Sequence, residues 1–195
     1  MRRLCFGGSF NPIHNGHLQC AAAVAQQAAY DRVVLIPAGH PPHKPPNAQM
    51  APAADRLSMC RLAAAQNPLF EVDDIEINRS GPNYTVDTAQ ELHRRGWAEV
   101  SWLIGADMAR YLPNWHEPDR LLADVHFVLI ARPGWSFDWE TMSPKFRHLQ
   151  QNVVQAPLID ISSSEIRRRV TAGESITDLT PPAVADYIAA HGLYR

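Results

Sequence analysis

The chain has 195 residues, of which 46% are hydrophobic and 19% are charged, and its formal net charge is −2. This length and composition are those of one compact globular domain and exclude a disordered chain. The slightly negative charge argues against a protein that holds a nucleic acid backbone, because that task needs a basic face.

In the first half of the chain, short apolar runs alternate with helical periodicity. Between the second predicted strand and the second predicted helix, residues 38–52 form a proline-rich loop that fits neither pattern. The elements predicted here are strands or extended segments at residues 4–6, 33–36 and 70–77, and helices at residues 17–29, 53–65 and 86–95.

The second half repeats this alternation. Strands that are apolar on both faces and alternate with helices indicate a parallel sheet covered on both sides. We therefore expect an α/β fold in a single domain over residues 1–195: a doubly wound, Rossmann-like parallel sheet with helices on both faces and a C-terminal helical part from about residue 163. The elements predicted here are strands at residues 100–104, 126–131 and 159–161, and helices at residues 117–123, 163–172 and 182–190.

The sequence also gives an expectation for the compartment. No apolar run at the start is long enough for a signal peptide, and no stretch has the length of a membrane-spanning helix. Cys5, Cys20 and Cys60 are odd in number and widely spaced, which suits reduced thiols better than a disulfide framework. We expect a cytoplasmic protein that is not attached to a membrane.

The loop after the first predicted strand carries the strongest chemical pattern. Residues 7–17 have the sequence GGSFNPIHNGH, and in a doubly wound sheet ligands bind outside the carboxyl ends of the strands. The glycines allow a close approach of backbone, and His14 and His17 lie where the loop enters a helix. Because the unpaired N–H groups of a helix N-terminus attract anions, this loop predicts a phosphate site.

Two simpler interpretations of the histidine pair compete with this one. Paired histidines can bind zinc, but no Glu lies inside the pair and no further Cys/His cluster has ligand spacing. The HxxH spacing alone is typical of ordinary surface histidines. The whole eleven-residue loop, placed directly after a strand, favours the phosphate site instead.

Residues 7–17 resemble the signature of the HxGH nucleotidyltransferases. Two further motifs follow in the same order as in one branch of them: residues 41–44 are PPHK, after the second strand, and residues 161–167 are ISSSEIR, before a helix. With these motifs the chain is similar over its full length to the bacterial nicotinate mononucleotide adenylyltransferases.

This resemblance implies transfer of AMP from ATP to nicotinate mononucleotide, giving deamido-NAD and pyrophosphate in NAD biosynthesis. It implies Mg²⁺ on the phosphates, with no metal ligand from protein side chains. The implied catalytic residues are His14, His17, Lys44 and Arg167. The implied ATP-binding residues are Gly8, Ser9, Phe10, Gly16, Gly105, Asp107, Ile161, Ser162 and Ser163. The residues implied to bind the nicotinate substrate are Tyr84, Thr85 and Trp115.

Taken alone, several of these residues have ordinary structural interpretations. The serines before residue 165 suit a helix N-cap, and Arg167 then suits a solvated helix face. Asp107 can cap a helix, Lys44 can be a solvated lysine, and an isolated Trp115 is more often part of a core. Their functional assignment depends on the resemblance and on their positions after strands.

The chain departs from the family pattern at two positions. Asn11 stands where many members have Asp, which keeps the side-chain shape and loses the charge. Ala38 stands where several members have Asn, so a side-chain contact from this position to the pyridine nucleotide is in doubt.

Three alternative functions remain to be weighed. An adenylyltransferase for another acceptor, such as nicotinamide mononucleotide or pantetheine phosphate, is the nearest, although pantetheine-phosphate enzymes resemble TxGH where this chain has His14. A fragment of a class I aminoacyl-tRNA synthetase would need a tRNA-binding domain. A nucleotide-binding regulator without turnover would not need both histidines together with Arg167. We expect ATP and nicotinate mononucleotide as partners, no nucleic acid and no membrane, with an oligomer left open.

Overall fold

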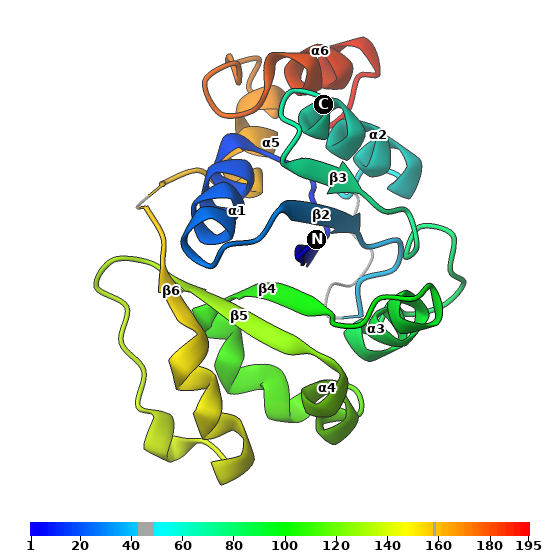
Figure 1. Cartoon of the computed structure of the whole chain (residues 1–195). Coiled ribbons are helices and arrows are strands. Elements are labelled where there is room, and N and C mark those ends of the chain that lie inside the picture. Colours follow the sequence, from blue (N-terminus) through cyan, green and yellow to red (C-terminus); the bar gives the residue numbers. More distant parts are fainter. Residues whose placement is uncertain (43–48, 158) are drawn as a thin grey trace.

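The computed structural model describes residues 1–42, 49–157 and 159–195. Within them, six strands form one parallel sheet in the order β3-β2-β1-β4-β5-β6 (Figure 1). The strand order reverses between β1 and β4, and this switch point opens a crevice outside their carboxyl ends. The strands are β1 (Arg3–Gly8), β2 (Arg32–Pro37), β3 (Phe70–Val72), β4 (Ser101–Gly105), β5 (His126–Ala131) and β6 (Val153–Gln155).

Helices cover both faces of the sheet, as the sequence predicts. Neighbouring strand residues point to opposite faces, so Leu4 packs into one core and Cys5 into the other. In Figure 1, α1 lies to the left of β2, α6 lies at the top, and α3 and α4 lie in the lower part. The helices of the core that contains Leu4 are α1 (Asn15–Gln27), α2 (Ala53–Ala64), α5 (Ser163–Thr171) and α6 (Pro182–Ala190). Those of the core that contains Cys5 are α3 (Thr85–Arg94) and α4 (Pro118–Asp124), joined by the 3₁₀ helices η1 (Ala106–Asn114), η2 (Trp139–Thr141) and η3 (Pro144–Asn152).

The doubly wound α/β fold is confirmed, and two local predictions are wrong. The expected strand at residues 159–161 does not form, and the last strand is β6, which pairs with β5. β6 is a short edge strand whose residues are only half-buried or exposed, so it needs no marked apolar run. Helix α1 begins at Asn15, with His14 as its N-cap, so His17 lies inside the first turn and does not open the helix.

Two further observations concern the helices and the cysteines. No helix in the described part of the chain is long and apolar enough to cross a membrane. Cys5, Cys20 and Cys60 are free thiols.

Candidate active site

Two cavities flank the loop that leaves β1. One, of about 300 Å³, lies toward α3 and η1, and the other, of about 310 Å³, lies toward α1 and α5. We call them the acceptor cavity and the histidine cavity. The acceptor cavity is lined by, among others, Gly8, Ser9, Ala38, Glu76, Tyr84, Thr85, Gly105, Trp115 and His116. The histidine cavity is lined by, among others, His14, Gly16, His17, Arg132, Ile161, Ser162 and Ser163.

His14 and His17 form a mutual pair at the start of α1. Each backbone N–H donates to Nδ1 of the other ring at 3.3 Å, and the rings stack with centroids 3.6 Å apart. Because Nδ1 accepts in both residues, the hydrogen of each neutral ring is on Nε2. The pair therefore carries two Nε2–H donors on a helix N-terminus, where anions are already favoured.

Burial keeps one of these rings neutral. His14 is only 6% exposed, and the loss of solvation lowers the pKa of its imidazole to about 4. At neutral pH His14 is therefore a hydrogen-bond donor without a charge of its own. A bound phosphate would favour the charged form and raise this pKa.

The loop's glycines and Phe10 hold the pair in place from within the protein. A Cβ on Gly16 would lie 3.1 Å from Nδ1 of His14, and a Cβ on Gly7 would lie 2.5 Å from the Trp102 ring. Phe10 is buried, and its ring centroid lies 5.3 Å from that of His17. Packing thus explains these glycines at least as well as ligand approach does, and Phe10 supports His17 from the core.

Helix α5 is hydrogen-bonded to this loop. The Ser162 side chain caps α5 by accepting from the Glu165 N–H at 3.1 Å, as predicted for these serines. Ser163 Oγ donates to the Pro12 carbonyl at 2.8 Å, and Arg167 Nη1 donates to the Asn11 carbonyl at 2.8 Å. Arg167, a residue of α5, is therefore hydrogen-bonded to the loop that carries the histidines. The Ser163 hydroxyl hydrogen is engaged by the Pro12 carbonyl, whereas the Ser162 hydroxyl only accepts in the cap bond.

The departure at Asn11 has a structural reason. Asn11 Nδ2 donates to the Gln49 carbonyl and Oδ1 accepts from the Ala51 N–H, both at 2.9 Å. A carboxylate at this position would place a second oxygen against the Gln49 carbonyl, so an amide fits this arrangement better. Lys44, expected in the catalytic set, lies outside the described residues.

The acceptor cavity faces the N-terminus of α3. Tyr84 is the N-cap of α3, and no side chain caps the helix there. The first-turn residues Thr85 and Val86 line the cavity, so the N–H groups of this turn and the positive end of the helix dipole are directed to it. Aromatic rings surround the same space: Tyr84 stacks on His116 with centroids 4.1 Å apart, and Trp115 packs edge-on against Phe127.

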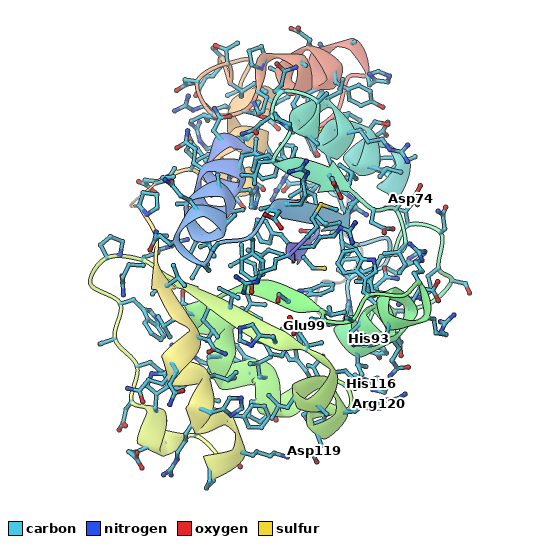
Figure 2. All side chains as sticks on the ribbon, in the orientation of Figure 1. Asp74, His93, Glu99, His116, Asp119 and Arg120 are labelled. Carbon is cyan, nitrogen blue, oxygen red and sulfur yellow. The ribbon has the colours of Figure 1, made fainter. Side chains whose placement is uncertain are left out.

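Sequence reasoning missed Arg132 and His116, which line the two cavities. Arg132 lines the histidine cavity directly after β5, and its position after a predicted strand was the available indication. His116 lines the acceptor cavity next to Trp115, and Figure 2 shows it on the α4 side of the molecule. Asp107 lies in the first turn of η1, is exposed, and accepts from the Trp135 indole N–H at 2.8 Å.

Glu76 is a buried carboxyl group in the wall of the acceptor cavity, and no motif pointed to it. It is 4% exposed, and Thr88 Oγ1 donates to it at 2.7 Å. Arg79 Nη1 reaches the same Thr88 hydroxyl at 3.1 Å. Burial raises the pKa of Glu76 to about 7, and the Thr88 hydrogen bond and the Arg79 charge only partly oppose the shift.

The raised pKa makes stability depend on pH. The unfolded chain loses the Glu76 proton near pH 4.5, whereas the folded protein keeps it to about pH 7, so stability is lost as the pH rises through this window. Glutamine stays neutral at every pH. The free energy of unfolding of Glu76→Gln, relative to that of the wild type, should therefore rise by about 2 kcal/mol from pH 5 to pH 8. Urea unfolding at both pH values measures the gain. The matched control is Glu99→Gln, which changes an exposed carboxylate; Glu99 is labelled in Figure 2. An equal gain in both variants would contradict the burial argument.

Fold and site together define the class of protein. A parallel sheet flanked by helices, with a loop that carries glycines and paired histidines between the first strand and the first helix, fits the Rossmann-like fold of the nucleotidyltransferases. Residues 5–169 match the family model described as Cytidylyltransferase-like. Among the residues that the structure describes, no group of three or more His, Cys, Asp or Glu is placed to hold a metal ion.

Curated relatives narrow the class to one family. The chain is 45% identical over 191 residues to a protein of Roseiflexus sp. (strain RS-1), covering 97% of this chain and 96% of the relative. It is 42% identical to a protein of Thermomicrobium roseum, covering 97% and 90%. Both relatives carry the name "Probable nicotinate-nucleotide adenylyltransferase". The chain belongs to the nicotinate-nucleotide adenylyltransferase family.

A solved structure agrees with this fold at lower sequence identity. The Plasmodium falciparum nicotinic acid mononucleotide adenylyltransferase, complexed with NaAD, has a TM-score of 0.74 and 22% identity to this chain. The match covers 100% of this chain and 98% of the other. At this identity, the likeness supports the architecture and not the roles of individual residues.

Proposed function

We propose that the protein transfers AMP from ATP to nicotinate mononucleotide, releasing pyrophosphate and forming deamido-NAD for NAD biosynthesis. The observation that carries this proposal is the stacked His14–His17 pair on the N-terminus of α1, which lines the histidine cavity, while Gly8 and Ser9 of the same loop line the acceptor cavity. One cavity offers phosphate donors and the other an aromatic wall with an uncapped helix end. This suits two substrates whose phosphates meet between the cavities.

The reaction needs little from the protein beyond positioning and charge. The phosphate of the acceptor attacks the α-phosphorus of ATP, a new P–O bond forms, and the bond to the β-phosphate breaks. Its electron pair leaves with pyrophosphate. The attacking phosphate is already ionised near neutral pH, so no protein base is required and no covalent intermediate forms. Catalysis then consists of in-line alignment and stabilisation of developing charge.

The ATP side is assigned to the histidine cavity and the loop above it. His14 and His17 donate from Nε2 to the α-phosphate, and Arg167, with Lys44, neutralises the leaving pyrophosphate. The backbone N–H groups of Gly8, Ser9, Ser162 and Ser163, close to Gly16 and Ile161, border the phosphate path. Asp107 receives the ribose hydroxyls, while its contact with Trp135 keeps the carboxylate oriented. Phe10 contributes only through packing beneath His17.

The acceptor side is assigned to the cavity between β4 and α3. Trp115 and Tyr84 supply flat surfaces for the pyridine ring, and the first turn of α3 at Thr85 supplies N–H donors for its carboxylate. Ala38 contributes only a methyl group. We place the protein in the cytoplasm, where its three free thiols would stay reduced.

Mg²⁺ is expected to enter with the phosphates of ATP. The ion prefers hard oxygen ligands, and the phosphates offer these. When bound, it lowers the charge repulsion between the phosphates and the attacking group. Activity should therefore be lost with EDTA and restored by Mg²⁺, and metal analysis of the purified protein should find far less than one zinc per chain. Stoichiometric zinc, with activity lost to a zinc-selective chelator in excess Mg²⁺, would reverse this assignment.

A comparison of turnover with different acceptors tests the proposed function itself. The protein is incubated with ATP, Mg²⁺ and, in turn, nicotinate mononucleotide, nicotinamide mononucleotide or pantetheine phosphate, and pyrophosphate release is followed. We expect the fastest turnover with nicotinate mononucleotide. Faster turnover with pantetheine phosphate, or none with any acceptor, would reject the proposal.

A further inference from the structure

The end of the chain returns to the first loop. The Tyr194 hydroxyl donates to Asn11 Oδ1 at 2.9 Å, across 183 positions of sequence. The Tyr194 carbonyl accepts from Thr171 Oγ1, at the end of α5, at 2.8 Å. Figure 1 shows the C-terminus beside α2, at the side of the molecule that holds α5 and α6.

The backbone of Tyr194 has an unusual conformation at this contact. Tyr194 has φ of +65°, in the left-handed region that a residue with a side chain rarely adopts. Such a conformation persists only where surrounding contacts hold it, which the Thr171 and Asn11 hydrogen bonds do. Burial raises the pKa of the Tyr194 phenol, so the group remains a neutral donor at physiological pH.

Asn11, the acceptor of this bond, joins several parts of the site. Its Oδ1 also accepts from the Ala51 N–H and its Nδ2 donates to the Gln49 carbonyl, which fixes the end of the proline-rich loop. Its own carbonyl accepts from Arg167 Nη1 at 2.8 Å. A carbonyl oxygen accepts two hydrogen bonds, so Ala51 and Tyr194 together saturate Oδ1 and leave the side chain one orientation.

We propose that Tyr194 is a positioning residue of the phosphate site: its hydroxyl locks Asn11, and through Asn11 it sets the position of Arg167. This inference rests on the proposed role of Arg167 in charge neutralisation. Arg167 and Tyr194 also line one hollow together with Gln49 and Ala51.

A second residue joins the same segments without this hydroxyl. Arg56, only 1% exposed, donates from Nη1 to the Ser9 carbonyl at 2.7 Å and from Nε to the Ala51 carbonyl at 3.1 Å. It therefore keeps the first loop joined to the start of α2 when Tyr194 is changed. Loss of the Tyr194 hydroxyl should loosen the position of Asn11 without unfolding the region.

Tyr194→Phe removes this single oxygen atom. We expect kcat for AMP transfer to fall about tenfold, because small displacements of charged groups at a phosphate lower the rate steeply. KM for nicotinate mononucleotide should stay within twofold, since the acceptor cavity is lined by other elements. Steady-state kinetics and thermal unfolding are measured on the same preparations.

The chain offers a matched control in Tyr187→Phe. The Tyr187 hydroxyl donates to Asp55 Oδ1 at 2.9 Å, so the same atom is lost from a bond between α6 and α2 outside the cavities. A purely structural role for Tyr194 predicts equal effects of the two changes, in Tm alone. Our proposal predicts that only Tyr194→Phe lowers kcat.

A double-mutant cycle with Asn11 completes the test. If Tyr194 acts through Asn11, its change to Phe should cost no further activity once Asn11 is Ala. Full additivity, or an unchanged kcat in Tyr194→Phe, would overturn the inference. His17→Ala in the same assay separates this result from the proposed function: activity lost there but kept in Tyr194→Phe rejects only the role of Tyr194, whereas activity kept in both rejects the site itself.

Discussion

His17→Ala should lower kcat by about a hundred- to a thousand-fold and leave KM for both substrates within a few-fold. Loss of one preorganised donor to a developing oxyanion typically has this effect. The His17 ring is held by the His14 N–H at Nδ1 and by Phe10 below it, so little reorganisation is needed when charge develops. Such an interaction acts mainly in the transition state and therefore appears in kcat.

The measurement is steady-state pyrophosphate release, with thermal unfolding to verify that the variant folds. His126→Ala is the matched control, since His126 is exposed at the first position of β5, at the opposite end of that strand from Ala131 and the Arg132 that lines the site. Near-normal kcat in a folded His17→Ala variant would remove His17 from the catalytic set.

The sequence was sufficient for the architecture because burial on both faces leaves a clear pattern. Residues 33–36 are all buried and apolar in β2, and residues 126–131 are β5 as predicted. The parallel alternation then placed the site, since the loops of such a sheet converge at the carboxyl ends of its strands. The cavities beside His14 and Thr85 lie there, while the roles of individual residues stay predictions.

What the sequence could not predict depends on weak local patterns or on distant contacts. The edge strand β6 has three residues and little buried surface, whereas Ile159 and Ile161 were mistaken for a strand because two of three residues there are β-branched. Asn11 and Tyr194 are 183 positions apart, and the hydrophobic periodicity of a sequence does not predict a hydrogen bond over such a distance along the chain. The pKa of Glu76 is likewise a property of burial, which appears only once the fold is known.

Nicotinate mononucleotide should be used at least about 10⁴-fold better than the nicotinamide form, measured as kcat/KM. The two acceptors differ by a carboxylate against a neutral amide, so discrimination needs donors directed at two oxygens. The first turn of α3 supplies N–H groups without a competing side-chain cap, and the Thr85 hydroxyl adds a further donor. An amide there would turn its NH₂ against donors and leave buried polar groups unpaired, which can reject an analogue by roughly this factor.

The aromatic wall should not contribute to this choice. Trp115 stacked on the electron-poor pyridinium would favour both acceptors alike, which raises affinity without selectivity. Ala38 offers no side-chain donor, so we assign the preference to the first turn of α3. Thr85→Val therefore separates the two kinds of donor: because backbone N–H groups remain, we expect the ratio to fall only about tenfold, by the loss of one hydrogen bond to a charged group. Thr177→Val, the same change at an exposed site, should leave the ratio unchanged. A wild-type ratio near unity would show that the uncapped end of α3 does not read the carboxylate, although AMP transfer itself could still proceed through the histidine pair.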